Sequence, residues 1–337
     1  MMFYENKKIV AARNSNLDTL RGVACILLVF YHAVGLDPAS GLRLPWDSRY
    51  HAFNEQLAYV RMPLFTFLSG IVYAIRPVSR GAAAHFAEGK LKRLLLPFIF
   101  VSLIFAVVQK LVPGTNSDLS WVQIPLVLIW PYGHFWFIAG LLLVFSLVGA
   151  LDYWQALDKP LHMFAFFALA CTLFEWHYGA VGVLSWNRAL FLLPFFVAGV
   201  ASKRFGCQWG LLCALVAVVS PGWELSLGVG FGVALLVLMP VIPLMGRIGI
   251  YSYSIYLFHV FGTASFRILW ARLGVSDIPF LLLSGTLAGL VVPIAIHLAL
   301  ERVPYASWAL LGIRPRLRPL KRHSLKFHLG GIDKREA

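Results

Sequence analysis

The feature of this chain that most constrains its fold is a series of long apolar segments separated by short polar ones. The segments recur from Leu17 to Leu300, and each is long enough for a helix that crosses the roughly 30 Å of hydrocarbon in a bilayer. Only 13% of the 337 residues are charged and 59% are hydrophobic, whereas about 25% of the residues of a typical soluble domain are charged. The sequence therefore predicts an all-α integral membrane protein.

The apolar segments divide into about ten predicted membrane-spanning helices. They cover residues 17–36, 57–75, 94–112, 134–151, 161–178, 186–201, 208–222, 224–242, 248–270 and 279–300. The polar stretches between them are too short for a soluble domain. We therefore expect a cytoplasmic N-terminal segment over residues 1–16, one membrane domain over residues 17–304, and a basic cytoplasmic tail over residues 305–337.

The formal net charge of +14 is unevenly distributed between alternate loops. Most of the 29 Lys and Arg residues fall on one side of the predicted bundle, around residues 7–13, 76–93, 203–204, 247 and 314–335. The positive-inside rule then predicts that both termini are cytoplasmic, which requires an even number of spans. The basic tail is interpreted as a topology determinant that lies on anionic lipid headgroups, and no nucleic-acid partner is expected.

Four cysteines bear on possible cofactors and cross-links. They are Cys25, Cys171, Cys207 and Cys213, and all lie within or beside apolar segments. Their spacing is typical neither of a zinc site nor of a disulfide framework. We therefore expect no metal.

Ionisable residues inside a membrane span are costly, so each one is a candidate functional residue. The first span holds Asp18, Arg21 and His32. Arg21 and His32 are eleven residues apart, which places them within about 20° on one helix face and roughly 16 Å apart along its axis. Two other interpretations stay open: Arg21 extends to the cytoplasmic headgroups, or His32 is a buried histidine bonded to a neighbouring helix.

Several motifs, in this order along the chain, resemble the signature of the acyltransferase family 3 membrane proteins. They are Leu17-Asp18-Thr19-Leu20-Arg21-Gly22-Val23-Ala24 with Tyr31-His32, the segment 62–70 ending in Leu68-Ser69-Gly70, the segment 90–97 from Lys90 to Pro97, His134-Phe135-Trp136-Phe137, the segment 252–259 from Ser252 to His259, and Glu301-Arg302-Val303-Pro304. The motifs extend over nearly the whole predicted membrane domain, and their joint order is more specific than any one of them.

This resemblance implies an enzyme, an O-acyltransferase in the cytoplasmic (inner) membrane of a bacterium. The implied donor is acyl-CoA, usually acetyl-CoA, and the acceptor is a hydroxyl of a polysaccharide, lipid-linked sugar or similar molecule. The family's catalytic arginine and histidine correspond to Arg21 and His32, and its basic pair that binds the donor corresponds to Lys90 and Arg93. The family often has arginine at both loop positions, so Lys90 is a departure; lysine offers charge to a phosphate but no bidentate fork.

The spacing of the first span suggests a hypothesis for the reaction. Lys90, Arg93 and Arg21 would hold the phosphates of acyl-CoA at the cytoplasmic face, and the pantetheine arm would extend along the first helix to His32. There the imidazole would act as general base on the acceptor hydroxyl or carry the acyl group transiently. The residues leave both routes open.

Six further residues are candidates for supporting roles: Asp18, Ser69, His134, Tyr256, His259 and Glu301. For Ser69, beside Gly70, close helix packing is favoured over catalysis. His259 and Tyr256 belong as readily to a structural interhelical network as to a catalytic one. His134 stacks on a sugar acceptor or joins Trp136 in an interfacial aromatic belt. Glu301 shares a helix face with His297, so the two orient each other, cap the nucleotide site or form a solvated helix end.

Two other functional classes compete with the enzyme. A transporter or flippase for a glycan or lipid precursor also carries charged residues inside its spans, and it predicts inverted repeats or broken helices, which the sequence does not show clearly. A non-catalytic membrane subunit of a polysaccharide export complex is the third class. The lipid bilayer is a partner in all three.

Overall fold

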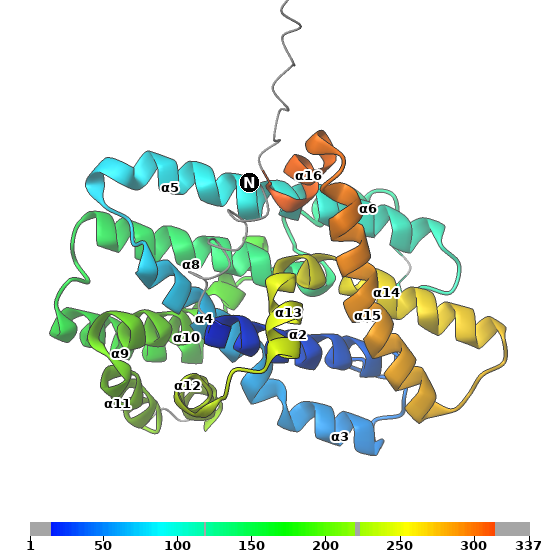
Figure 1. Cartoon of the computed structure of the whole chain (residues 1–337), viewed down its shortest axis with the longest axis horizontal. Coiled ribbons are helices and arrows are strands. Elements are labelled where there is room, and N and C mark those ends of the chain that lie inside the picture. The colour runs from blue at the N-terminus through cyan, green and yellow to red at the C-terminus, as the bar shows by residue number, and fades with distance from the viewer. Residues whose placement is uncertain (1–14, 118, 220–222, 314–337) are drawn as a thin grey trace, which may run out of the picture.

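The computed structural model describes residues 15–117, 119–219 and 223–313, and all secondary structure within them is helical (Figure 1). The first part contains α2 Ser15–Val34, α3 Arg49–Gln56, α4 Ala58–Ile75, η1 Arg80–Ala82, α5 Ala83–Lys90, η2 Leu91–Leu95, α6 Leu96–Leu111, α7 Gln123–Leu126, η3 Gly133–Phe135 and α8 Trp136–Tyr153. The second part contains α9 Pro160–Glu175, η4 Trp176–Tyr178, η5 Val183–Ser185, α10 Trp186–Phe205, α11 Cys207–Ala217, α12 Trp223–Leu238, α13 Pro243–Ile250, α14 Ser252–Arg272, α15 Ile278–Leu300 and α16 Pro304–Leu311.

Within the described residues, six helical segments are long and apolar enough to cross a membrane: Ser15–Val34, Arg49–Ile75, Arg80–Leu111, Gly133–Tyr153, Val183–Phe205 and Ile278–Leu300. Each of the ten predicted spans overlaps a helix, so an all-helical membrane protein is confirmed. The number ten and the cytoplasmic termini remain predictions. The apolar helices α11 and α12 are only 11 and 16 residues long, and α12 is seen nearly end-on in Figure 1 while α8 and α10 run across the view.

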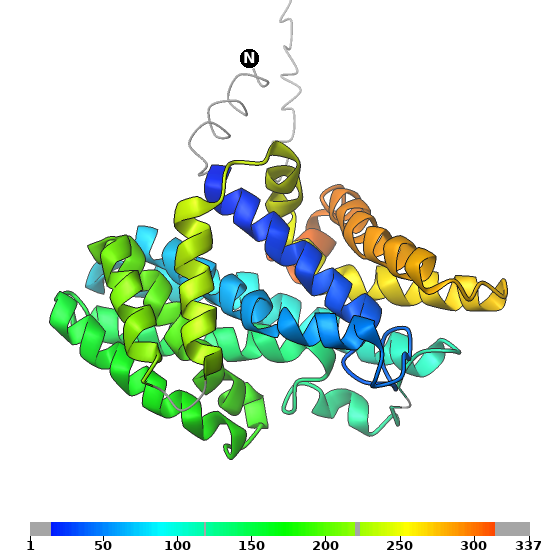
Figure 2. The same ribbon diagram turned by 90° about the horizontal axis from the view of Figure 1, so that it is seen from below.

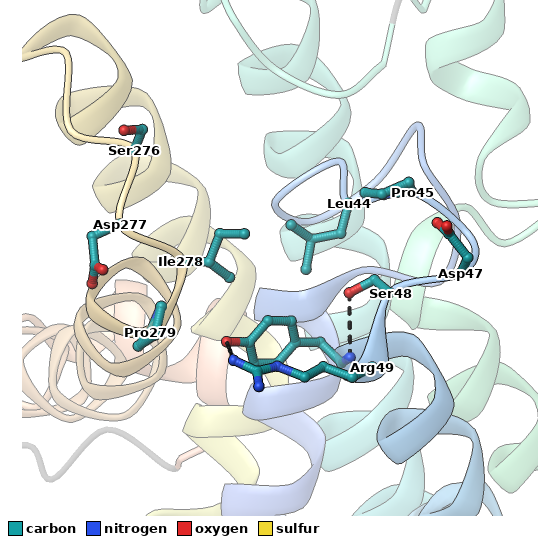
Figure 3. Close-up of a pocket in the computed structure, with 10 residues that line it drawn as sticks. Leu44, Pro45, Asp47, Ser48, Arg49, Ser276, Asp277, Ile278 and Pro279 are labelled. Atoms are coloured by element: carbon teal, nitrogen blue, oxygen red, sulfur yellow. Dashed lines mark hydrogen bonds between the residues drawn. The ribbon is translucent and has the colours of Figure 1, made fainter.

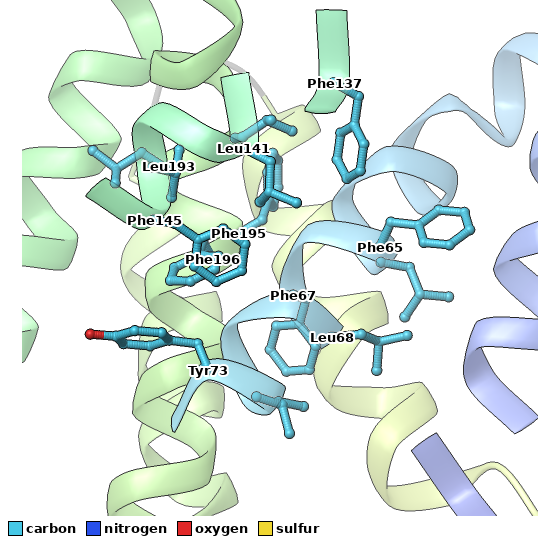
Figure 4. Close-up of a cluster of buried hydrophobic side chains, with 14 of the residues drawn as sticks. Phe65, Phe67, Leu68, Tyr73, Phe137, Leu141, Phe145, Leu193, Phe195 and Phe196 are labelled. Atoms are coloured by element: carbon cyan, nitrogen blue, oxygen red, sulfur yellow. The ribbon is translucent and has the colours of Figure 1, made fainter. Parts of the chain in front are cut away.

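The centre of the bundle is an aromatic core between α4, α8 and α10 (Figure 4). The Phe145 and Phe196 rings meet edge to face with their centroids 5.0 Å apart, and the centroid of Tyr73 lies 5.6 Å from that of Phe196. Edge-to-face pairs of this kind add to the stability from burial alone. The core fixes α4 and α8 relative to each other.

Glycines bring α4 and α10 into backbone contact. A Cβ on Gly70 would overlap the carbonyl oxygen of Phe196, and a Cβ on Gly199 would overlap the carbonyl oxygen of Phe67. Small residues allow this close approach between membrane helices. Ser69, next to Gly70, donates its hydroxyl hydrogen bond to Phe65 O within its own helix at 2.8 Å. These contacts support the packing interpretation of Ser69 and Gly70.

The first helix, α2, is enclosed by α4, α13, α14 and α15, and Figure 2 shows its full length. At its Ser15 end, α13 packs closely: a Cβ on Gly22 would overlap the Met245 carbonyl, and one on Gly249 would overlap the Asp18 carbonyl. α2 contains no proline and runs unbroken from Ser15 to Val34. It therefore holds Arg21 and His32 at fixed separation and on one face, as the sequence predicted.

The predicted tail begins with an ordered helix. α16 packs on α6 and buries Ser307 and Leu311, and Gly312 (φ +65°) lies directly against the backbone of Lys92 and Arg93. The basic residues beyond 313 and those before residue 15 lie outside the described residues. The three-part division of the chain therefore remains a prediction.

Candidate functional site

Three histidines from three separate segments meet at the Val34 end of α2. His32 comes from α2, His134 from η3 and His259 from α14. The ring centroid of His259 lies 4.7 Å from that of His32 and 4.7 Å from that of His134, and the His32 and His134 centroids are 5.9 Å apart. The sequence singled out each histidine, and the structure brings all three together.

The described residues contain no group of three or more His, Cys, Asp or Glu side chains placed to hold a metal ion. The three rings contact one another in tilted or edge-to-face geometry. Two of them are deeply buried: His259 is 0% and His134 is 3% exposed. Because imidazole nitrogens donate and accept hydrogen bonds, the cluster is suited to hydrogen bonding or to proton transfer.

Tyr256 ties α14 to the start of α8 beside the histidines. Its hydroxyl donates to His134 O at 2.6 Å and accepts from Ile138 N at 3.3 Å. His134 in turn places Nε2 3.4 Å from Leu257 O. Tyr256 therefore supports the cluster by fixing the backbone that carries His134.

A cavity of about 180 Å³ opens beside this cluster. Its lining includes His32, Phe105, Gln109, Tyr132, His134 and Thr263. The amide oxygen of Gln109 is buried without a hydrogen-bond partner in the described part of the chain. The sequence did not single out Gln109 and Thr263, because each is only an uncharged polar residue within a predicted span. The volume is below the roughly 300–1,000 Å³ of pockets for drug-sized ligands, so it suits one small unit.

Two loops that line this cavity, one after α2 and one after α6, are joined by hydrogen bonds and are called the tied loops. Arg43 Nε donates to Asn116 Oδ1 at 2.9 Å, and Asn116 Nδ2 donates to Gly41 O at 3.1 Å. From α14, Arg267 Nη2 donates to Gly114 O at 2.8 Å. Gly41, Asn116 and Arg267 all line the cavity.

A larger pocket of about 570 Å³ lies at the same end of the bundle, between the loop before α3 and the loop from α14 to α15 (Figure 3). Its lining includes Asp47, Arg49 and Asp277 but none of the predicted site residues. Its size alone does not make it the reaction site, because the histidines that the sequence singled out, His32 and His134, line the smaller cavity.

Arg61 is a further charged residue near His32. The structure buries it inside α4. Its guanidinium carbon lies 3.9 Å from the centre of the Tyr31 ring, and Nη1 donates to Asn54 Oδ1 at 2.6 Å. Arg61 therefore anchors α4 and α3 against the end of α2 and does not line the cavity.

Asp18 and Arg21 occupy the opposite, Ser15 end of α2. Arg21 Nη1 donates to Asp18 Oδ1 at 2.9 Å; Asp18 is buried and the Arg21 side chain is 23% exposed. One turn further on, Cys25 Sγ lies 4.0 Å from Ser252 O at the start of α14. Asp18 thus orients Arg21 and leaves part of its guanidinium accessible.

Lys90 and Arg93 lie where α5 passes through the single π-helical turn η2 into α6. The Lys90 ammonium is 3.2 Å from the centre of the Phe145 ring on α8. Arg93 is exposed, and its backbone oxygen accepts a hydrogen bond from the Tyr253 hydroxyl. Arg93 thereby sits beside the start of α14, which also contacts α2, whereas Lys90 faces α8.

A polar chain links α14 and α15 at the Ser15 end. Ser254 Oγ lies 2.7 Å from His297 Nδ1, and His297 Nε2 lies 3.4 Å from Glu301 Oε1. The predicted contact between His297 and Glu301 is therefore present. Because Glu301 is exposed and Ser254 is buried, the chain runs from solvent into the bundle.

The site thus has two parts joined by one helix: a basic end with Arg21 and Arg93, and a histidine end with a cavity. The model of acyltransferase family 3, which is described as an acyltransferase domain, matches residues 14–209. No curated protein and no solved structure matches the chain. The matched region covers α2 and with it Asp18, Arg21 and His32, and it is more than half of the chain. The protein is therefore an acyltransferase that belongs to acyltransferase family 3.

Proposed function

We propose that this acyltransferase moves an acyl group, acetyl in the first instance, from cytoplasmic acyl-CoA to a hydroxyl of a polysaccharide, lipid-linked sugar or similar acceptor. One observation carries the proposal. A single unbroken helix holds a partly accessible arginine at one end and, roughly 16 Å away, a histidine that lines a cavity at the other. Such a separation matches a donor with phosphates at one end and a thioester at the other.

The donor would bind with its phosphates at the Ser15 end. Arg21 and Arg93 offer guanidinium groups, which match phosphate geometry, and Lys90 adds charge from the same segment. The polar chain of Ser254, His297 and Glu301 lies on the neighbouring helices α14 and α15. In a cytoplasmic membrane this end would face the cytoplasm, where acyl-CoA is found.

His32 would carry out the chemistry by one of two routes. As general base, it takes the proton of the acceptor hydroxyl while the hydroxyl oxygen bonds to the thioester carbon; the C–S bond breaks and the proton passes to the CoA thiolate. As acyl carrier, its imidazole nitrogen first bonds to the thioester carbon, the C–S bond breaks, and the imidazole N–H proton passes to the CoA thiolate. The acceptor hydroxyl oxygen then bonds to the acyl carbon, the bond to the imidazole breaks, and the hydroxyl proton returns to the imidazole. Mass spectrometry of the protein quenched after acyl-CoA addition, without acceptor, distinguishes them by an acetyl adduct on His32.

The acceptor would occupy the cavity beside His32. Aromatic rings of Phe105 and Tyr132 and the polar groups of Gln109 and Thr263 line it, a mixture typical of small-molecule sites. The cavity admits one small unit, which suits a single sugar ring.

The first test is release of free CoA from acetyl-CoA by purified protein in detergent, with and without a panel of glycoside acceptors. His32→Ala should lower turnover by about 10²–10⁴-fold, the usual contribution of general acid–base catalysis, with acetyl-CoA binding largely kept. Arg21→Ala should instead raise the Kd for acetyl-CoA about tenfold or more, since a charge-assisted hydrogen bond contributes about 1.5–3 kcal/mol.

Matched substitutions at exposed positions serve as controls: His85→Ala on α5 and Arg76→Ala after α4. Both should behave as wild type. A wild-type protein that neither binds acetyl-CoA nor releases CoA contradicts the proposal and favours the transporter or flippase. A folded His32→Ala protein with full turnover removes His32 from the reaction by either route.

A further inference from the structure

The imidazole of His259 is held in one tautomer by its own helix. Its Nδ1 lies 2.9 Å from Ile255 O and 2.9 Å from Tyr256 O. Carbonyl oxygens only accept hydrogen bonds, so Nδ1 carries the proton, and in the neutral ring Nε2 carries a lone pair. The ring is fully buried, so the tautomer and the direction of that lone pair are fixed by α14.

His259 Nε2 has no hydrogen-bond partner in the described part of the chain. An unpaired acceptor in a buried site is costly, and His259 is 0% exposed, so bulk water does not reach this nitrogen. Native buried polar groups without a partner are few, and such a group at a site of reaction calls for an explanation.

Two neighbouring rings are close enough to serve the nitrogen, His32 and His134, each with its centroid 4.7 Å away. His134 already has a hydrogen-bond partner, because its Nε2 lies 3.4 Å from Leu257 O. Nε2 of His134 therefore carries the proton, and in the neutral ring its Nδ1 is an acceptor. Two acceptors do not bond to each other. His32 makes no hydrogen bond within the described residues, and its N–H is free to turn toward His259.

We infer that His259 is the positioning residue for His32: its Nε2 accepts the N–H of His32 and thereby fixes the tautomer and orientation of that ring for acyl transfer. This inference rests on the proposed function. With one nitrogen of His32 donating to His259, the lone pair on the other is available on the cavity side. When His32 takes up a proton it becomes a cation, and its hydrogen bond to His259 becomes charge-assisted and stronger. The same neighbour thus holds the base before proton transfer and stabilises it afterwards.

Two substitutions of His259 distinguish the loss of its Nε2 acceptor from the loss of its packing. In His259→Asn, the side-chain amide can still donate to the Ile255 and Tyr256 carbonyls as Nδ1 does, but no acceptor remains at the Nε2 position. In His259→Gln, the longer side chain can place its amide oxygen near that position. His177→Asn is the matched control, because His177 is also buried, also bonds an i−3 carbonyl through Nδ1, and does not line the cavity.

The measurement is kcat and KM for CoA release from acetyl-CoA, per amount of folded protein, with gel filtration in detergent as the fold check. His259→Asn should lower kcat about 10–100-fold, similar to the loss when a residue that orients a metal-bound histidine is removed, with KM for acetyl-CoA within about threefold. His259→Gln should recover at least about tenfold of that loss. His177→Asn should keep the wild-type kcat.

A double substitution distinguishes positioning from simple structural support. If His259 acts through His32, adding His259→Asn to His32→Ala should cost nothing further, because residues that act as a unit are not additive. A folded His259→Asn protein with wild-type kcat, no recovery in His259→Gln, or an equal further loss in the His32→Ala background each overturns the inference. Failure of the proposed function would look different: the wild type itself would show no His32-dependent CoA release.

Discussion

At the scale of single residues, charged groups of the same predicted role have different environments. The ammonium of Lys90 rests on the Phe145 ring, 3.2 Å from its centre, with the Phe86 ring also within 5.2 Å. Arg93 is exposed, and within the described part of the chain only its backbone is hydrogen-bonded, by the Tyr253 hydroxyl. A cation on an aromatic face is stabilised by about 2 kcal/mol when it is shielded from water, so Lys90 must give up that contact to reach a phosphate, whereas Arg93 need not.

We therefore expect Arg93→Met and Lys90→Met to affect different properties. Arg93→Met should raise the Kd for acetyl-CoA about tenfold, since it removes a charge-assisted contact to phosphate. Lys90→Met should change this Kd by less than about threefold and should lower the thermal stability, because the cation on Phe145 is lost. Isothermal titration with acetyl-CoA and thermal unfolding followed by tryptophan fluorescence measure the two effects. A larger change in Kd for Lys90→Met than for Arg93→Met would assign the phosphate contact to Lys90.

Much of the candidate site was recognisable in the sequence as separate residues but not as a cluster. His32, His134 and His259 stood out because ionisable groups are rare in apolar spans. Their meeting depends on how α2, η3 and α14 pack, and no local pattern encodes that. Gln109 and Thr263 gave too weak a signal to be singled out. The sequence also did not reveal the buried network in which Asp152 accepts hydrogen bonds from Tyr73 and from Arg204. Asp152 and Arg204 each lie near the end of a predicted span, but which residues they contact depends on how the helices pack.

At the scale of elements, the long helices were predictable and the short ones were not. α2, α4, α8 and α15 each contain a long apolar run, so their positions agree with the predicted spans to within a few residues. α3, α13 and α16 have eight residues each and no such run. Two of these short helices nonetheless hold the long ones in place: α13 through close contact with α2, and α16 through contact with α6.

The contact between α4 and α10 makes a direct prediction about stability. Gly70→Ala adds a Cβ that would overlap the Phe196 carbonyl oxygen, and backbone cannot move aside as a flexible side chain can. Overpacking of this kind costs about 1–3 kcal/mol, so the midpoint of thermal unfolding in detergent should fall. Gly230→Ala on α12 is the control, because a Cβ there meets nothing within 4 Å; its midpoint should be unchanged or higher. Equal midpoints for the two variants would contradict close packing of α4 on α10.

At the scale of the whole molecule, the two ends of the bundle differ in chemistry. The Ser15 end carries Arg21, Lys90 and Arg93, and the Val34 end carries the histidine cluster, the cavity and the tied loops. The positive-inside rule predicts that the first end faces the cytoplasm. Donor and acceptor would then approach from opposite sides of the membrane, with the bundle between them.

This orientation can be tested by cysteine labelling in intact cells. Cys25, Cys171 and Cys213 are buried and Cys207 is half-buried, so Cys207→Ser gives a suitable background. A cysteine at Ala39, which is exposed in the loop after α2, should react with a membrane-impermeant maleimide added outside. One at Ala84, exposed on α5 beside the cationic segment, should react only after the membrane is permeabilised. The reverse pattern would place the histidine cavity on the cytoplasmic side.

The unbroken course of α2 also restricts how this protein can diverge during evolution. Each residue inserted between Arg21 and His32 would turn everything beyond it by about 100° and advance it by about 1.5 Å. One inserted residue would turn His32 away from His134 and His259. Four inserted residues would return His32 to about the same helix face but would lengthen the distance between Arg21 and His32 by about 6 Å, which the donor would then have to span. We therefore expect homologous proteins with the same chemistry to vary in side chains along this stretch while keeping its eleven-residue register.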